Sequence, residues 1–323
     1  MSIPHLASSG DIAVLFPGQG SQRVGMGTWL FREVPQMRET LDAVSAFAGC
    51  DIAKLCARGP MSLLSDTRYT QPAMFAVGIA AFRYLACLGT PATVLAGHSV
   101  GEITAMCASG ALSADRAAAL VCERGRLMAS APGTGQMALI TGLGRDIVQR
   151  CCDDCAAAGR VVIAAQNGQD EHVVSGDEQA VMMCCDLAVS FGARRAGRLR
   201  TSHAFHSPLM QPVLASWQSV VNQLGLEPAS IPVILNVTAE IATDPQRLRS
   251  GLLHQLTRPV EWWSTMRTLV KLGVRKAVVC EAGNYLSLLA RNAGLYPLSF
   301  ANPGHIRELQ HASRAGVRWP VAT

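Results

Sequence analysis

The hexapeptide Gly97-His98-Ser99-Val100-Gly101-Glu102 constrains this chain more than any other stretch. An apolar run over 92–96 enters it, and an alanine-rich helical pattern leaves it. A Gly-x-Ser-x-Gly sequence between a strand and a helix is the signature of a nucleophile elbow, a turn so tight that only glycine fits beside the serine. Small residues also occupy ordinary turns, but this context favours a nucleophilic Ser99 beside the first amides of a helix.

The bulk properties fit a folded protein of about two domains. Of its 323 residues, 49% are hydrophobic and 16% charged, so the chain can bury a full core. Residues 1–10 show no basic segment followed by an apolar one, so we expect no secretory leader. The most apolar long segment, 72–88, carries Arg83 and is too short to span a bilayer. We therefore expect a buried helix there, no membrane segment and a cytoplasmic protein.

Eleven cysteines are present, including the adjacent pairs Cys151-Cys152 and Cys184-Cys185. Without an export signal we expect free thiols rather than disulfides. Cys151, Cys152 and Cys155 raise the alternative of a metal site, but no second cluster with matching spacing follows. We interpret them as thiols on a helix and expect no bound metal.

The net charge is +5, and nearly all of the positive charge is arginine. The densest basic stretch holds Arg194, Arg195, Arg198 and Arg200. Such a stretch is most often a solvated face, and an acidic protein partner is the more specific alternative. No aromatic residues are interleaved with these arginines, so the pattern does not favour nucleic acid.

The region before the hexapeptide predicts a strand followed by a polar loop. Residues 12–16 are a short β-rich run, which Pro17-Gly18-Gln19-Gly20-Ser21-Gln22 ends. This loop places Gln19 at the carboxyl edge of a sheet, where α/β proteins build their sites. The glycine spacing does not match Gly-x-Gly-x-x-Gly, so we reject a dinucleotide site. Helical patterns then cover 35–48 and 71–88.

A further helix is expected over 114–131, and it contains Glu123-Arg124-Gly125-Arg126. Glycine inside a helix costs about 1 kcal/mol relative to alanine. Its presence beside Arg124 therefore suggests that a backbone or a ligand approaches closely. The alternative, a surface arginine, stays open on this pattern alone.

The pattern changes over 135–200, where strands and helices follow one another in the order βαββαβ. This order is the split βαβ of a ferredoxin-like unit. We therefore predict an inserted subdomain over 134–202 and a main domain made of 1–133 and 203–323. The expected elements are strands over 136–141, 161–167, 172–175 and 194–200, and helices over 145–158 and 178–191.

The segment after this unit supplies a candidate base. Within 203–208, Pro208 suits the first turn of a helix over 209–224 and leaves His206 on the loop before it. A lone histidine is more often structural, but its place at a domain crossing favours catalysis. Asn236-Val237-Thr238 matches a glycosylation sequon, which would be idle in a cytosolic protein. The remaining pattern predicts strands over 233–237 and 277–280 and helices over 244–256, 262–272 and 285–293.

Five motifs occur in one order: FPGQGSQ at 16–22, GHSVGE at 97–102, ERG at 123–125, HAFHS at 203–207 and QLTRPVEW at 255–262. Together they resemble the malonyl-CoA:acyl carrier protein transacylase family, stand-alone enzymes of fatty-acid synthesis and acyltransferase domains of polyketide synthases. The resemblance covers about residues 11–300. It implies an α/β fold with an α/β-hydrolase-like large domain, an inserted ferredoxin-like subdomain and an active site between them.

The resemblance also implies roles for individual residues. Ser99 would be the nucleophile and His206 its general base and later acid. Gln19 and the backbone amide of Val100 would form the oxyanion hole. Arg124 would bind the free carboxylate of a malonyl group.

Two further residues follow from the motifs. Gln255 would stand beside His206 and orient its ring, because this family uses a serine–histidine pair without a carboxylate third member. Phe205 belongs to a His-Ala-Phe-His tetrad similar to the form that accompanies malonyl selectivity, and we expect it to crowd the α-carbon. Two departures stand out: 281–284 lacks the usual Gly-Pro pair, which leaves the loop geometry open, and Gln136 replaces a small residue near the expected acyl pocket.

The implied activity is transfer of a malonyl group from malonyl-CoA to the phosphopantetheine thiol of an acidic acyl carrier protein. The resemblance implies no bound cofactor, and we expect a monomer. The expected docking surface is Arg194, Arg195 and Arg198, or Arg275 and Lys276. Three alternatives are weighed: an α/β thioester hydrolase, an acyltransferase for a bulkier acyl group, and a non-catalytic docking subunit. No HGGG-type loop supports the hydrolase.

Overall fold

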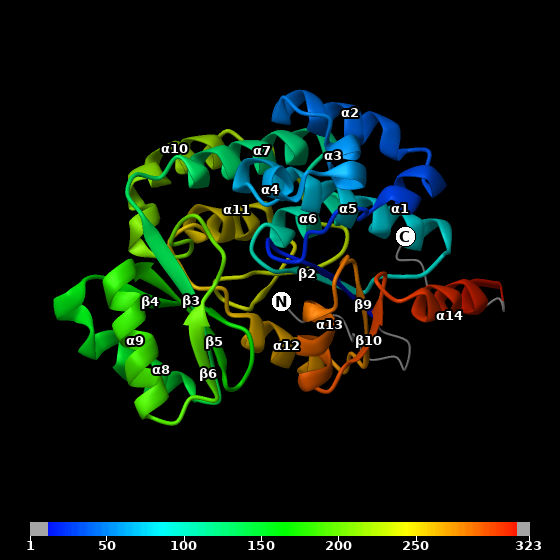
Figure 1. Ribbon diagram of the computed structural model, residues 1–323. Helices are drawn as coiled ribbons and strands as arrows, with labels where there is room; N and C mark the ends of the chain where they lie inside the picture. Colours follow the sequence, from blue (N-terminus) through cyan, green and yellow to red (C-terminus); the bar gives the residue numbers. More distant parts are fainter. Residues whose placement is uncertain (1–11, 315–323) are drawn as a thin grey trace.

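The computed structural model describes residues 12–314, which form two units, each built on its own β-sheet (Figure 1). The larger sheet has six strands and is parallel except for the edge strand β8. Each central strand is an apolar run buried on both faces, as expected where helices cover a parallel sheet. In spatial order the strands are β10 (Tyr296–Ser299), β9 (Lys276–Val279), β1 (Ile12–Phe16), β2 (Val94–Gly97), β7 (Val233–Ile234) and β8 (Ile241–Ala242).

Helices surround this sheet, and α5 (Thr67–Cys87) is buried along most of its length. The Asp66 carboxylate accepts the Arg68 amide at 2.9 Å and starts α5 four residues before the predicted position. The other helices of the unit are α1 (Thr28–Glu33), α2 (Met37–Ala48), α3 (Ile52–Arg58), α4 (Met61–Leu64), α6 (Gly101–Ala108), α7 (Ala114–Ala129), the 3-10 turn η2 (Pro208–Met210), α10 (Gln211–Asn222), α11 (Pro245–His254), α12 (Trp262–Lys271), α13 (Tyr285–Asn292) and α14 (Pro303–Arg314).

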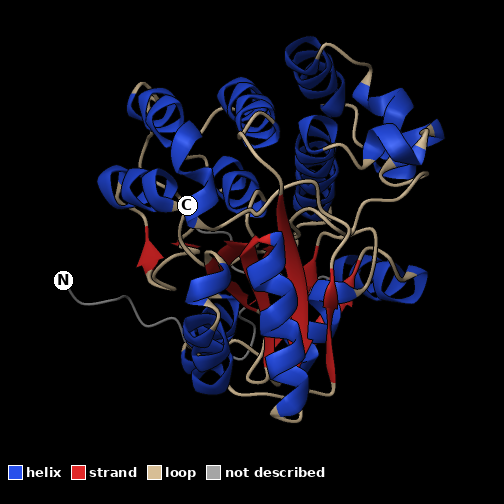
Figure 2. Ribbon diagram, turned by 60° about the vertical axis from the view of Figure 1, so that its left-hand side comes forward, coloured by secondary structure: helices blue, strands red, loops and turns tan. Residues whose placement is uncertain are grey.

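The smaller sheet is antiparallel, with strand order β4-β5-β3-β6. Figure 2 shows helices lying across the strands of the molecule. Side chains of the smaller sheet alternate along β3: Ala138 and Ile140 enter the core beneath two helices, whereas Met137 and Leu139 face the larger unit. This order of a βαββαβ unit is ferredoxin-like. The elements are β3 (Gly135–Thr141), α8 (Arg145–Asp154), the 3-10 turn η1 (Ala156–Ala158), β4 (Val161–Gln166), β5 (Glu171–Asp177), α9 (Glu178–Ser190) and β6 (Arg195–Arg198).

The predicted α/β fold class, a large sheet unit with a small antiparallel insertion, is confirmed. Some elements were missed. Strands β8 and β10 were not predicted, because strands of two to four residues carry little periodicity, and α14 follows the last element that was predicted. The predicted strand over 233–237 ends at Ile234, and the one over 194–200 shortens to 195–198.

Two expectations on the ends and the membrane need separate statements. The expected absence of a leader falls on residues 1–10, outside the described residues. Within 12–314, no helix is long and apolar enough to cross a membrane. The segment that was interpreted as a buried helix is the core of α5.

Candidate active site

The elbow forms where β2 runs into α6. Ser99 has a φ of 53°, a left-handed conformation that costs a non-glycine residue energy and lifts its side chain out of the turn. A Cβ on Gly97 would lie 1.9 Å from the carbonyl carbon of Gly101, and one on Gly101 would lie 2.3 Å from the Phe16 oxygen. No real Cβ tolerates such contacts, so both positions require glycine.

His206 lies on the loop before η2 and reaches the elbow. Its Nε2 is 2.8 Å from the Ser99 Oγ. Its Nδ1 lies 2.8 Å from the Gln255 carbonyl oxygen and 3.2 Å from that of Arg258. Carbonyls only accept hydrogen bonds, so Nδ1 carries the proton and Nε2 is free to accept from the serine hydroxyl. No carboxylate is needed to set this tautomer.

Arg124 extends from α7 into the same space and is 1% exposed. Its Nε donates to the Gln255 Oε1 at 2.8 Å, one terminal nitrogen donates to the Gln71 Oε1 at 2.8 Å, and the other lies 3.1 Å from the Ser99 Oγ. The neighbouring Gly125 packs on α5, since an added Cβ would lie 2.8 Å from the Thr67 oxygen. The close approach inferred from the glycine is thus a backbone contact.

Gln255 lies beside His206, but the two halves of the residue serve different partners. Its main-chain oxygen contacts the histidine ring, whereas its side chain contacts Arg124, Ser99 and Glu102. Gln255 was predicted to orient His206 and stays a prediction in that role; the contact that could serve it comes from the main-chain oxygen, whereas the side chain contacts the arginine.

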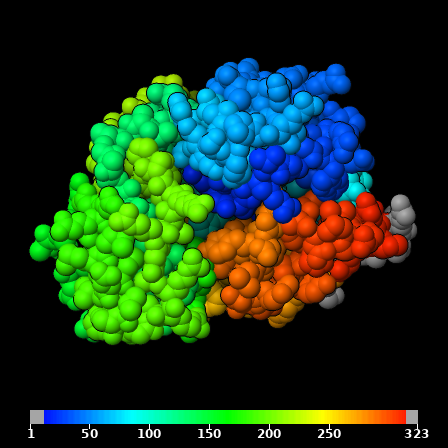
Figure 3. Space-filling view, in the orientation of Figure 1, coloured from blue at the N-terminus to red at the C-terminus, as the bar shows by residue number. Residues whose placement is uncertain are grey.

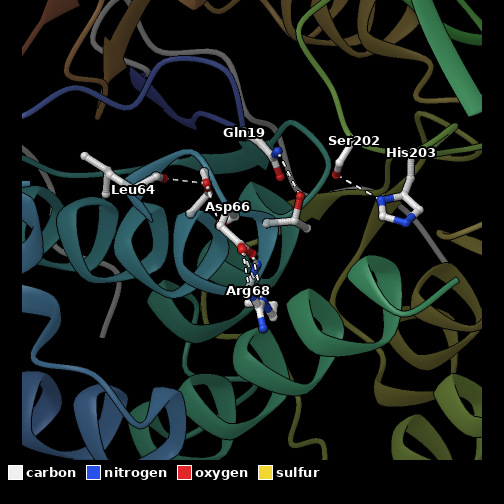
Figure 4. A network of polar contacts seen from close by, with 8 residues as sticks. Gln19, Leu64, Asp66, Arg68, Ser202 and His203 are labelled. Carbon is white, nitrogen blue, oxygen red and sulfur yellow. Dashed lines mark hydrogen bonds and ion pairs between the residues drawn. The ribbon is translucent and has the colours of Figure 1, made fainter. Parts of the chain in front are cut away.

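Two amides border the serine. Within the described part of the chain, the main-chain amides of Gln19 and Val100 donate to no other residue. The Gln19 side chain is turned to the Thr67 hydroxyl, which it contacts at 3.1 Å (Figure 4). Because that side chain is already engaged, the main-chain amide is the group that Gln19 can offer to an oxyanion.

A cavity of about 300 Å³ connects these residues. It lies where the small unit, drawn in green, meets the blue and orange parts of the large one (Figure 3). One wall is polar and comes from the large unit, and the other is apolar and comes from the antiparallel sheet. Phe205 lines the cavity, but Gln136 does not: its amide donates to the Leu199 oxygen at 2.9 Å. The apolar wall consists of Met137, Leu139, Ala164, Ala165, Val173 and Leu199.

Burial dominates the electrostatics of the cavity. Desolvation lowers the pKa of His206 to about 3, with further lowering by the Arg124 charge. Desolvation also lowers the pKa of Arg124 to about 9, against a raising contribution from Glu102. At neutral pH the histidine is therefore an uncharged base beside a charged guanidinium.

Asn236 is a residue of the site that was not predicted, and the sequon that it begins was expected to be idle. It is 2% exposed, so it cannot act as a glycosylation acceptor. Its Oδ1 accepts the Ser99 amide at 2.7 Å, and its Nδ2 donates to the Gly97 oxygen at 2.6 Å. The side chain thus clamps both sides of the elbow. Its position after β7, at the carboxyl edge beside β2, was the signal available.

Three polar residues that were not predicted join the two units at the cavity. The His98 Nε2 lies 2.9 Å from the Asn167 Oδ1, and the Asn167 Nδ2 donates to the Tyr285 hydroxyl at 2.8 Å. Desolvation lowers the pKa of His98, so this ring is also neutral. Asn167 belongs to the small unit and Tyr285 to α13, so the contacts fix one unit against the other.

The unusual segment over 281–284 starts α13 by a different device from the expected Gly-Pro pair. The buried carboxylate of Glu281 accepts the Leu286 amide at 3.0 Å and the Ser287 amide at 3.1 Å. It therefore satisfies helix amides that a capping residue otherwise takes. The loop geometry left open by the sequence is supplied by this carboxylate.

The cysteines of the small unit are core residues. Cys151, Cys152 and Cys155 lie on or beside α8 and are buried, and the sulfur of Cys152 is 3.9 Å from that of Cys184 on α9. All eleven cysteines are free thiols. Within 12–314 there is no group of three or more His, Cys, Asp or Glu residues arranged to hold a metal.

Fold and cavity together define an α/β enzyme of two units that share one site. The chain belongs to the acyl transferase family, whose domain model matches residues 14–282. Over 297 residues it is 33% identical to the malonyl CoA-acyl carrier protein transacylase of Bacillus subtilis, covering 90% of this chain and 94% of that one. Over 295 residues it is 38% identical to the spectinabilin polyketide synthase system protein NorB of Streptomyces orinoci, covering 88% of this chain but 13% of NorB.

Solved structures give the same result. The malonyl CoA-acyl carrier protein transacylase of Coxiella burnetii matches with a TM-score of 0.89 and 32% identity, over 93% of this chain and 97% of that one. A malonyl-transacylase solved in complex with a type II polyketide synthase acyl carrier protein matches with a TM-score of 0.88 and 30% identity, over 93% and 99%. The protein is therefore an acyltransferase.

Proposed function

We propose that this acyltransferase moves a malonyl group from CoA to the phosphopantetheine thiol of an acyl carrier protein, through an ester on Ser99. One observation carries the proposal: a single buried cavity holds a serine hydroxyl 2.8 Å from a neutral histidine nitrogen and 3.1 Å from a buried arginine. The first contact suits nucleophilic attack, and the second suits a carboxylate-bearing acyl group.

In the first half-reaction, the His206 Nε2 takes the proton of the Ser99 hydroxyl as its oxygen attacks the thioester carbonyl. The oxygen of the tetrahedral intermediate accepts hydrogen bonds from the amides of Gln19 and Val100, and each such donor contributes on the order of 3 kcal/mol in comparable sites. The C–S bond breaks, and the imidazolium returns the proton to the departing CoA thiolate. A malonyl-serine ester remains.

Arg124 would select the acyl group. A guanidinium has five N–H donors, and three are engaged by Gln255, Gln71 and Ser99. One N–H on each terminal nitrogen is left, which is the fork that a carboxylate binds with both oxygens. An acetyl group has no carboxylate to accept these two hydrogen bonds, so only a malonyl-type group gains binding energy from them.

In the second half-reaction, the carrier thiol gives its proton to the His206 Nε2 and attacks the ester carbonyl. The C–O bond to Ser99 breaks, and the imidazolium returns the proton to the serine oxygen. Product and reactants balance without any redox partner or metal. Because the acyl donor and the acyl acceptor use one site in turn, the kinetics should be ping-pong.

We infer that the acidic carrier docks beside the cavity mouth on the small unit. Leu199 and Thr201 line the cavity, and the exposed Arg200 stands between them. Two arginines of the expected patch are paired: Arg194 with Asp170, and Arg198 with Glu178 at 2.6 Å. The alternative surface is less suitable, because Lys276 begins β9 and so lies at the sheet edge opposite the elbow. The proposed functional unit is the monomer.

A thioester hydrolase is the main rival. The charge-bearing third member of a hydrolase triad would contact the His206 Nδ1, where two carbonyls stand here. A buried arginine at the nucleophile also has no role in simple ester hydrolysis. Both observations favour transfer.

The experiment mixes enzyme with malonyl-CoA and no carrier, and follows free CoA thiol. We expect a burst of thiol equal to the enzyme concentration, then slow release, and full turnover once holo-carrier is added. The carrier without its phosphopantetheine is the matched control. Continuous CoA release without carrier would make the protein a hydrolase, and a burst in Ser99→Ala would contradict the assigned nucleophile.

A further inference from the structure

Glu102, the last residue of the elbow hexapeptide, has no task in the reaction just described, yet it is 0% exposed. Its carboxylate lies in the first turn of α6. One oxygen accepts the Asn236 amide at 2.9 Å, and the other accepts the side-chain amide of Gln255. A buried carboxylate is costly unless its partners satisfy it, so its presence beneath the active site calls for a purpose.

Hydrogen-bond polarity fixes how Gln255 must point. Its NH₂ group donates to Glu102 and to the Ser99 main-chain oxygen, at 3.1 Å for the latter, and its Oε1 accepts the Nε–H of Arg124. Turning the amide over would set its oxygen against two acceptors and its NH₂ against a donor. The carboxylate and the Ser99 oxygen thus together determine which end of Gln255 meets the arginine.

We propose that Glu102 is a positioning residue for acyl selection. Its carboxylate fixes the Gln255 amide, the amide fixes the Arg124 fork, and the fork prefers malonyl over acetyl. The inference rests on the proposed function, since it explains how the carboxylate-binding group of that function is held. Glu102 itself touches neither the substrate nor the reacting atoms.

Glu102→Gln tests this chain because it keeps the size of the side chain and changes one acceptor into a donor. Whichever way the new amide turns, its NH₂ meets either the Asn236 N–H or the Gln255 NH₂. Gln255 can relieve the second conflict only by turning over, which places its NH₂ against Arg124. In that orientation the conflict is passed to the fork, and in the other it falls on the main-chain amide of Asn236.

The measurement is the ratio of kcat/KM for malonyl-CoA to that for acetyl-CoA. We expect Glu102→Gln to lower this ratio roughly 10- to 100-fold, the size of a buried hydrogen-bond conflict. Glu102→Asp keeps two acceptors on a shorter side chain, so its ratio should fall between those of wild type and Glu102→Gln. If Glu102→Gln does not fold, the aspartate variant carries the test.

A matched control is Glu281→Gln. Glu281 is also buried and also accepts main-chain amides, but it lies at α13 and outside this network. Its loss should lower thermal stability and leave the malonyl-to-acetyl ratio within about twofold of wild type. A general effect of losing a buried carboxylate would instead move both ratios together.

Two results would overturn the inference. An unchanged ratio in both Glu102 variants would make the residue purely structural. A rise in the ratio would mean that Glu102 acts as a negative charge competing with malonyl for Arg124. Either result, combined with a collapsed ratio in Arg124→Ala, leaves the proposed function standing; an unchanged ratio in Arg124→Ala defeats the proposed function itself.

Discussion

The two walls of the cavity are built on opposite principles. On the large unit, Arg124 and Gln71 belong to a polar wall, and Gln255 holds the Arg124 guanidinium by a hydrogen bond to its Nε. On the small unit, side chains such as Met137, Leu139 and Val173 form an apolar wall that follows from strand alternation. A polar network tolerates almost no change, since each broken partner leaves a buried group unsatisfied, whereas apolar packing yields gradually. The polar wall suits the fixed position of a charged group, and the apolar wall suits an uncharged part of the substrate.

The largest effect should come from the base on the polar side. Among residues 12–314, His206 is the only group in hydrogen-bond contact with the Ser99 Oγ that can take its proton, since the other contact is the Arg124 guanidinium, which is charged at neutral pH; His206→Ala removes it. We expect acylation by malonyl-CoA to slow by about 10⁴-fold or more, as in other serine–histidine sites. Stopped-flow release of CoA measures this, with circular dichroism to check the fold. A loss below tenfold would mean that another base acts.

Arg124→Ala tests the polar wall itself. The malonyl carboxylate would lose a charge-assisted, two-pronged partner in a buried cavity, so kcat/KM for malonyl-CoA should fall about 100-fold or more. Acetyl-CoA should be hardly affected. Steady-state kinetics with both thioesters give the ratio. Equal losses for the two substrates would assign Arg124 to the fold rather than to selection.

Much of this site was predictable from the sequence, and the reason is local geometry. Gly97 and Gly101 identify the elbow, because no other residue fits the turn. The five motifs, taken together, predicted that Ser99, His206 and Arg124 share one site. Asn236 and Glu102 were not predictable as partners. The Ser99–Asn236 contact joins residues 137 positions apart, and the Gln255–Glu102 contact 153. No local pattern reports hydrogen bonds across such separations.

In the fold, too, local features were predictable and features set by distant residues were not. Long helices and buried strands with strong periodicity were predicted, and the βαββαβ order gave the antiparallel unit. The short strands β8 and β10 were missed because their pairing is decided by neighbours in the sheet. The start of α5 was placed at residue 71, whereas Asp66 caps a helix that begins at Thr67.

A smaller effect is expected where the walls meet, at Phe205. This side chain is 6% exposed and lines the cavity. Phe205→Ala should open space at the α-carbon and raise methylmalonyl use relative to malonyl by about tenfold, the range that one methyl group allows. Competition between the two thioesters checks this. A variant that gains malonyl use and loses methylmalonyl use would contradict the assignment.

A substitution at Arg200, beside the cavity mouth, should change activity less than a substitution in either wall. Arg200→Glu reverses one exposed charge, so transfer to the carrier should slow a few-fold, mainly through association, and added salt should reduce the difference. The burst with malonyl-CoA alone should not change. Carrier titrations at two salt concentrations measure the effect. Insensitivity to both charge and salt would place the carrier elsewhere.

The rate of acetyl transfer should not change near pH 6.5, where an enzyme with an exposed catalytic histidine would show a large change. Because the pKa of His206 is lowered to about 3, the base stays neutral from pH 5.5 to 8, and acetyl transfer should lack an inflection near 6.5. The unfolded chain binds a proton at the ordinary histidine pKa, whereas the folded chain does not. Stability from this group therefore falls as pH falls from about 6.5 toward 3. Because desolvation raises the pKa of Glu102 to about 7, the measurement must follow the His206 imidazole itself, by NMR; a His206 imidazole that titrates near 6.5 in the free enzyme would contradict the burial argument.

The most direct test of the account offers malonyl-, methylmalonyl- and acetyl-CoA together and weighs the intact protein. A polar wall that selects a carboxylate, beside an apolar wall that fits a small acyl group, predicts one adduct, malonyl, located on Ser99 by peptide mapping. Arg124→Ala should lose that preference under the same conditions. An adduct that is mainly acetyl on the wild-type protein, or one carried by a residue other than Ser99, would contradict the account.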